Sequence, residues 1–123
     1  MTSVTMSKVK LKPEDQAAAE MVQDIFGELG ALNIRRMFGG LGVYASGIFF
    51  AMIWKGDIYI HTDEALAKKL QKLGSKQFVY TFPNTGKTTR FSYWSLPDDV
   101  ADDRQRALKL GEAALEIARK KRK

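Results

Sequence analysis

The sequence predicts a single-domain α+β protein in which an antiparallel sheet is covered by helices. Segments whose apolar residues recur every three or four positions lie near both ends and in the middle of the chain, as in amphipathic helices. Between them are runs rich in β-branched and aromatic residues, separated by turn residues. The length of 123 residues suits one domain with one core. The predicted order of elements is α-β-β-β-α-β-β-α.

Each predicted helix has a recognisable boundary. The first begins at Pro13 and ends at Gly30, the second has Thr62 as N-cap and ends at Gly74, and the third begins near Asp103. The positions expected to face the core are Ala18, Met21, Val22, Ile25, Phe26 and Leu29, then Leu66, Ala67, Leu70 and Leu73, then Ala107, Leu110, Gly111, Ala114, Ile117 and Ala118.

The first three strands come from the most apolar part of the chain. From Met37 to Trp54 there are 18 residues without a charge, long enough to raise the alternative of a membrane helix. Four glycines within nine residues argue against a helix. Ser46–Gly47 and Lys55–Gly56 are typical of tight turns, so we predict a meander from about Arg36 to His61. A second hairpin is expected from Gln77–Phe82 and Thr89–Ser95.

Two segments imitate nucleotide-binding motifs. Gly40–Ala45 matches the dinucleotide fingerprint, and Asn84–Thr88 ends like a phosphate-binding loop. Both motifs require a helix directly afterwards, whereas both segments are followed by predicted strands. We therefore interpret them as structural and expect no nucleotide cofactor.

The strand Ile48–Trp54 is apolar on both faces. Strict alternation places Ile48, Phe50, Met52 and Trp54 on one face and Phe49, Ala51 and Ile53 on the other. Three helices cover one face of a small sheet more easily than both, so either loops or the terminal helix cover the second face or another chain does. From this strand we predict a homodimer.

The net charge of +6 comes from the two ends of the chain. Without Lys8, Lys10, Lys12 and the five basic residues at the end, the chain has 12 basic and 14 acidic residues. We predict a disordered basic arm over residues 1–12, a folded domain over 13–118 and a basic tail over 119–123. The tail residues Arg119, Lys120, Lys121, Arg122 and Lys123 are either a solvated end or a weak, sequence-independent contact for nucleic acid.

No constellation of residues suits catalysis. The chain has no cysteine, which excludes disulfides and thiolate chemistry and fits the cytoplasm. Its single histidine, His61, is expected at the end of a strand as a surface or capping residue, and no second ligand stands at a metal-like spacing. The acidic pairs fall at helix starts, where the helix dipole explains them. We therefore expect a protein that is not an enzyme and has neither metal nor cofactor.

Arg35 and Arg36 directly precede Met37. Two interpretations apply: one guanidinium binds an acidic partner or a phosphate, or both flank a buried strand and pair with acids on a helix.

Several motifs along the chain resemble the N-terminal domain of the TfoX/Sxy family. The fairly specific core is Arg36, Met37, Phe38, Gly39 and Gly40, followed by Gly42. The similarity covers roughly Pro13 to Ala118 and continues through Ser46, Gly47, Phe50, Ala51, Tyr59, Asp63, Glu64, Gly74, Phe78, Tyr80, Tyr93, Trp94, Leu96 and Pro97. It implies a fold of the secretion-chaperone type.

The resemblance also implies a function. The founding members of the family regulate competence for DNA uptake together with a transcription activator, and they carry a second, C-terminal domain, which we expect to be absent here. We therefore predict a cytoplasmic, non-enzymatic regulatory or adaptor domain that binds a protein partner in the transcription machinery. The alternative is the weak nucleic-acid binder described above. No catalytic residues follow from the resemblance.

Overall fold

The structure, a computed structural model, describes residues 12–37 and 39–121. Most of the predicted basic arm, together with Phe38, Arg122 and Lys123, therefore lies outside the described residues. The elements in chain order are α1 (Pro13–Phe26), a 3₁₀ turn η1 (Gly27–Leu29), β1 (Leu32–Met37), β2 (Gly40–Ala45), β3 (Ile48–Trp54), β4 (Asp57–His61), α2 (Glu64–Lys72), β5 (Gln77–Thr81), β6 (Thr88–Ser95), α3 (Asp98–Ala101) and α4 (Arg104–Lys121).

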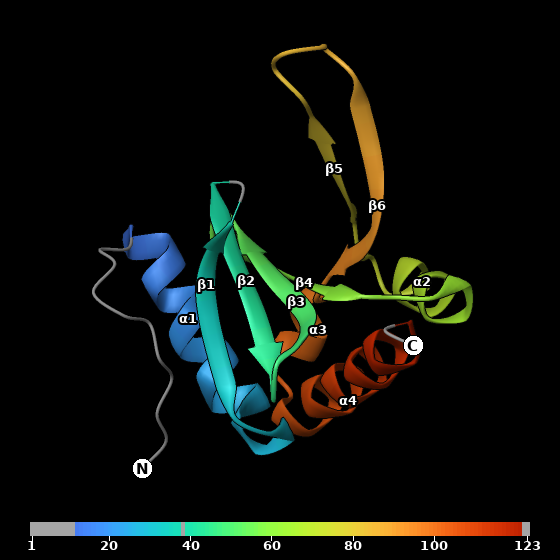
Figure 1. The fold of residues 1–123 in the computed structure, drawn as a ribbon. Coiled ribbons are helices and arrows are strands. Elements are labelled where there is room, and N and C mark those ends of the chain that lie inside the picture. Colours follow the sequence, from blue (N-terminus) through green and yellow to red (C-terminus); the bar gives the residue numbers. More distant parts are fainter. Residues whose placement is uncertain (1–11, 38, 122–123) are drawn as a thin grey trace.

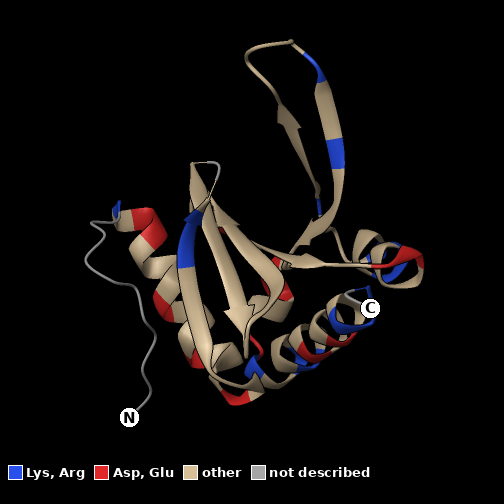
Figure 2. Cartoon of the chain, viewed as in Figure 1, with Lys and Arg blue, Asp and Glu red and all other residues tan. Residues whose placement is uncertain are grey.

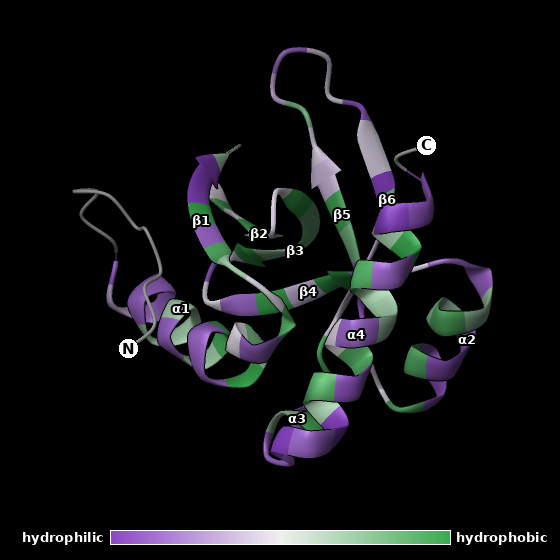
Figure 3. Cartoon of the chain, turned by 60° about the horizontal axis from the view of Figure 1, so that its bottom comes forward, coloured by the Kyte–Doolittle hydropathy of each residue, from purple (hydrophilic) through white to green (hydrophobic). Residues whose placement is uncertain are grey.

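The predicted α+β fold with an antiparallel sheet is confirmed. Six strands form one sheet in the order β1-β2-β3-β4-β6-β5, and every neighbouring pair is antiparallel. Helices α1 and α4 pack against β3 and β4 and against each other (Figure 1). Apolar residues recur along both helices with polar residues between them (Figure 3). The apolar residues form one side of each helix, and this side packs against the sheet. Among the described residues, no helix is long and apolar enough to cross a membrane.

The prediction missed one strand. Strand β1 lies almost entirely before Arg36, where we expected the meander to begin, so four strands rather than three lie before α2. Its apolar alternation, Leu32 and Ile34, ends at the two arginines and is too short to identify a strand. Pairing with β2 along its whole length supplies the stabilisation that the local sequence does not.

The turns and helix ends agree closely with the sequence. Both Ser46–Gly47 and Lys55–Gly56 have positive φ at each central residue (49° and 83°, 51° and 84°), which is the geometry of two-residue hairpins. Helix α1 begins at Pro13 as predicted. The N-cap of α2 differs, because Asp63 rather than Thr62 accepts the hydrogen bond from the backbone N–H of Leu66, at 2.9 Å.

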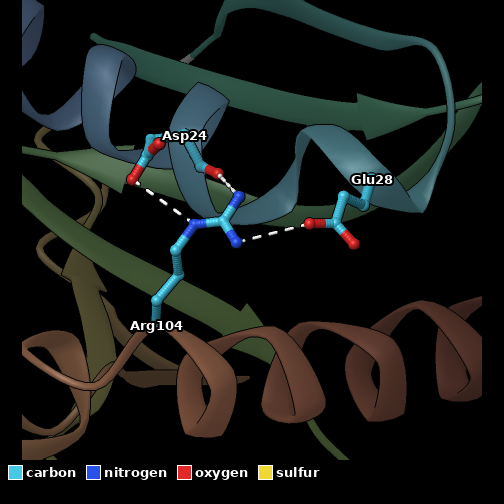
Figure 4. Close-up of polar contacts among 3 residues, drawn as sticks. All are labelled: Asp24, Glu28 and Arg104. Carbon is cyan, nitrogen blue, oxygen red and sulfur yellow. Dashed lines mark hydrogen bonds and ion pairs between the residues drawn. The ribbon is translucent and has the colours of Figure 1, made fainter.

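Helix α4 packs closely on α1. A β-carbon at Gly111 of α4 would overlap the ring of Phe26, so the missing side chain allows the close approach. At the exposed edge of this contact, Arg104 binds the end of α1 and η1 (Figure 4). Its guanidinium donates to the Asp24 carbonyl at 2.8 Å and lies 3.3 Å from a carboxylate oxygen of Glu28. These exposed ion pairs contribute little to stability by themselves.

A β-bulge in β3 overturns the predicted faces of that strand. The register shifts so that Val43 pairs with Ala51 and Tyr44 with Phe49, which leaves Phe50 without a partner in β2. Phe50, Ala51 and Ile53 consequently face the helices and belong to the main core. Phe49, Met52 and Trp54 face the opposite side of the sheet. Strict alternation is therefore wrong after Phe50, because the extra residue places Phe50 and Ala51 on the same face.

Candidate binding groove

The face of the sheet opposite the helices carries a second apolar cluster. Its buried members are Met52, Tyr59 and Phe78, from three different strands. Although β4 and β6 separate β3 from β5 in the sheet, the Trp54 ring lies 5.5 Å from the rings of both Phe78 and Tyr80. The sheet is therefore strongly curved, and the β5–β6 hairpin projects beyond the other strands (Figure 1) and leans over this face. The chain itself covers part of the second face, but it does so with the β5–β6 hairpin and not with loops or the terminal helix, as one alternative had expected.

A groove of about 100 Å³ lies between the hairpin and the rest of this face, and we call it the aromatic groove. For comparison, an engineered cavity of about 150 Å³ accommodates benzene. The groove is lined by apolar or aromatic side chains: Met37 from β1, Phe49 and Met52 from β3, and Phe78, Tyr80, Phe82, Phe91 and Tyr93 from the hairpin and its loop. Phe82 is 37% exposed at its rim. The lining offers no acid, base or strong nucleophile, so this groove is suited to binding.

The glycine motif forms the base of this groove. A β-carbon at Gly42 would come within 2.5 Å of the Met37 sulfur and 3.2 Å of the Phe49 ring, so the bare backbone leaves space for two lining side chains. At Gly40, a β-carbon would lie 2.5 Å from the carbonyl oxygen of Ile53 and 2.9 Å from the Trp54 ring. Gly39 has a φ of 81° in the turn between β1 and β2. Close packing on this face thus explains why the motif has glycine at positions 40 and 42.

The two arginines before the motif are exposed. The guanidinium carbon of Arg35 lies 5.1 Å from the centre of the Tyr44 ring, a cation–π contact on the groove side of the sheet. This differs from the predicted pairing with helix acids, because no ion pair of Arg35 is present among the described residues. Arg36 lies next to it on the same edge strand.

His61 is buried, not at the surface as predicted. Only 8% of it is exposed, and its ring lies 4.9 Å from the Tyr93 ring. A shallow pocket beside it is also lined by Tyr44, Phe49 and Lys121. Its Nδ1 atom has no hydrogen-bond partner within the part of the chain that the structure describes. Burial, and secondarily the charge of Lys121, lowers the pKa of His61, whereas Asp63 acts in the opposite direction.

The buried imidazole makes stability depend on pH. The unfolded chain takes up a proton near pH 6.5, whereas folded His61 takes it up only at its lower pKa. We expect the free energy of unfolding to fall as the pH drops below about 6.5 towards that lower pKa. Urea denaturation at about pH 8, 6.5 and 5 should show a smaller loss for His61→Gln than for the natural chain. An equal loss in the two proteins would contradict this assignment.

The other candidates from the sequence are placed as follows. Gly40–Ala45 forms β2, and the segment from Asn84 to Lys87 is a hairpin loop that leads into β6, so neither nucleotide-like motif precedes a helix. Arg119, Lys120 and Lys121 extend α4 as its last turn, and Arg119 pairs with Glu116 at 2.9 Å. No group of three or more His, Asp or Glu side chains that could hold a metal ion occurs in residues 12–37 and 39–121.

Comparison with known protein families tests the resemblance to the TfoX N-terminal domain that the motifs suggest. The family model of the TfoX N-terminal domain matches residues 24–118, which is most of the chain. The chain belongs to the TfoX N-terminal domain family.

A curated relative supports this membership. The TfoX N-terminal domain described here is 24% identical over 86 residues to a protein of Aliivibrio fischeri named DNA transformation protein TfoX1. The match covers 68% of this chain and 41% of the relative, so it spans about two fifths of the relative's length.

The glycine motif of this TfoX N-terminal domain is visible in its sequence, whereas the groove that the motif supports is not. The hairpin residues Phe78, Tyr80 and Phe82 all line the groove. The contacts of Phe78 and Tyr80 with Trp54 could not be predicted, because they depend on the curvature of the whole sheet.

Proposed function

We propose that this TfoX N-terminal domain is a non-enzymatic, cytoplasmic regulatory domain that controls transcription of DNA-uptake genes by binding a protein partner. Membership of the family over residues 24–118 carries the proposal. The relative named for DNA transformation supports the link to DNA uptake. Because the chain spans 41% of that relative, transfer of the whole protein's role is part of the proposal.

The aromatic groove supplies a surface suited to such a partner. Aromatic side chains dominate the energetics of many protein interfaces, because they bury a large apolar area with few rotatable bonds. Phe82 at the rim and Tyr80 beside it line the groove and are available for such contacts. The centres of their two rings are 4.9 Å apart. Val79 is also exposed but lies outside the groove lining, which makes it a matched control on the same hairpin.

Genetic replacement tests this function. Four strains carry the natural gene, a deletion, Phe82→Ala or Val79→Ala, and transcripts of DNA-uptake genes and transformation frequency are measured in each. We expect the deletion and Phe82→Ala to lower both quantities by about tenfold, the effect of losing one interface anchor. Val79→Ala should match the natural gene. A deletion strain with unchanged transcripts would contradict the function, whatever the groove binds.

The nucleic-acid alternative rests on the basic last turn of α4, which presents Arg119, Lys120 and Lys121. It predicts DNA binding that is insensitive to sequence, falls steeply with salt and disappears when residues 119–123 are removed. Our proposal predicts instead that the full chain and the truncated chain both fail to bind duplex DNA at physiological salt. Fluorescence anisotropy on both proteins distinguishes these results.

The predicted homodimer stays a prediction. The β5–β6 hairpin covers part of the face from which it was inferred. Light scattering at tens of micromolar decides it, since a monomer has a mass of 13.8 kDa.

A further inference from the structure

Charge is distributed unequally between the sheet and the helices. Residues 32–61 and 76–95, which contain all six strands, include six basic residues and one acidic residue, Asp57. The other 13 acidic residues lie in the remaining segments. Figure 2 shows this separation, with red concentrated on the helices and blue along β1 and β6. The sheet is therefore positively charged although the folded body as a whole is nearly neutral.

Two of these cations lie on rings that border the aromatic groove. Arg35 lies over Tyr44, whose ring is 5.2 Å from that of Phe49 in the groove lining. On the other side, the Lys55 ammonium lies 5.9 Å from the centre of the Trp54 ring, which contacts Phe78 and Tyr80.

Neither cation is neutralised by an ion pair within the described part of the chain. Burial, and secondarily the charge of Asp57, the acidic residue of the sheet, raises the pKa of the Tyr59 hydroxyl. The groove thus combines an apolar centre with positive charge on two sides.

We propose that the aromatic groove binds an acidic peptide segment of a partner protein, with a bulky apolar side chain in the groove and carboxylates against Arg35 and Lys55. This inference rests on the proposed function, because it assumes a protein partner. The groove volume of about 100 Å³ fits one such side chain. Exposed cations on the rim attract an acidic segment and accelerate its association, and salt weakens this effect.

The same features disfavour other occupants. In a symmetric dimer through this groove, Arg35 and Lys55 of one copy would meet the positively charged face of the other. Single-stranded nucleic acid would use the rings for stacking and the cations for phosphates. However, Trp54 packs edge-to-face against both Phe78 and Tyr80, at interplanar angles of 73° and 88°, so these rings do not present parallel platforms. A side chain enters such a groove more readily than a base.

Selection from a phage-displayed library of random peptides of about 12 residues tests the proposal without knowledge of the partner. The natural chain is the target, and the Phe82→Ser variant removes peptides that bind elsewhere. We expect the recovered peptides to share one bulky apolar residue flanked by Asp or Glu. Peptides with no acidic preference, or no enrichment over the Phe82→Ser variant, would overturn the proposal.

Binding of a recovered peptide to matched variants adds a second measurement. Phe82→Ser should weaken binding about tenfold, whereas Val79→Ser, on the same hairpin but outside the groove, should not. Arg35→Glu should weaken binding and reduce its salt dependence, whereas Arg90→Glu, at an exposed position outside the lining, should have little effect. Circular dichroism of each variant confirms that it is folded. Equal effects of Arg35→Glu and Arg90→Glu would show that only overall charge matters and would overturn the assignment.

Two further outcomes identify other occupants. Binding of a fluorescein-labelled oligothymidine that is lost in Phe82→Ser but kept in Val79→Ser would assign the groove to nucleic acid. A dimer that dissociates in Phe82→Ser would assign it to a second copy. Either outcome would overturn the proposal that the groove binds an acidic segment. If the selection fails while the Phe82→Ala strain still loses transcription, the proposed function stands and only the chemistry of the partner is wrong.

Discussion

Replacement of Phe26 by alanine is expected to lower the free energy of unfolding by about 3–5 kcal/mol. The side chain is fully buried where α1, α4 and β3 meet. Its ring makes an edge-to-face contact with Phe50, with centres 5.6 Å apart, and covers the bare backbone at Gly111. Alanine removes the contacts to Phe50 and Gly111. It also leaves a cavity between α1, α4 and β3 that these three elements cannot fill by moving. Urea denaturation followed by circular dichroism measures the loss.

Met21→Ala on the same helix is the matched control. Met21 is 38% exposed, so its truncation removes little buried area and should change the free energy of unfolding by less than about 1 kcal/mol. Similar losses in the two variants would show that α1 does not pack through Phe26 as described. Because the aromatic groove lies on the opposite face of the sheet, a partly destabilised Phe26→Ala chain should still bind the groove ligand while it is folded.

Gly40→Ala is expected to destabilise the protein by about 3 kcal/mol, the upper end of the usual cost of overpacking. The new methyl group would lie 2.5 Å from the backbone carbonyl oxygen of Ile53 and 2.9 Å from the Trp54 ring. A flexible side chain could move away, but a carbonyl in the middle of a sheet moves only with its strand. Thermal denaturation should show the loss, and the fluorescence of Trp54 should change because its ring must shift.

Gly27→Ala is the control for that substitution. Nothing lies within 4 Å of a β-carbon at Gly27, and its φ of −59° is ordinary helical geometry. We expect a change between zero and a stabilisation of about 1 kcal/mol, since alanine restricts the unfolded chain. If Gly40→Ala were as harmless as Gly27→Ala, the explanation of the glycine motif by packing would be wrong.

Part of the candidate site could have been predicted. The separation of charge needed only a count of charged residues in the predicted strands, because Arg35, Arg36, Lys55, Lys87 and Arg90 are all visible in the sequence. The separation is not visible in the net charge of the whole folded body, because the acidic residues of the helices offset the basic residues of the sheet. The contact between Trp54 and the hairpin could not be found in this way, since those residues are far apart in the chain and in the order of strands.

The burial of His61 shows a similar limit. A single polar residue at the end of a strand gives no local sign of burial. Its environment comes from Tyr93 on the neighbouring strand and from Lys121 at the end of α4.

The sequence by itself determined the α+β class, the two tight turns at Ser46–Gly47 and Lys55–Gly56, and the family. These depend on local periodicity, on positive φ at turn residues and on short motifs, all of which are encoded over a few neighbouring residues. The tertiary structure decided which face of the sheet each side chain of β3 takes, because the bulge at Phe50 is set by pairing with β2. It also decided that the chain forms a groove, because the curvature that brings Tyr80 to Trp54 results from the packing of the entire sheet.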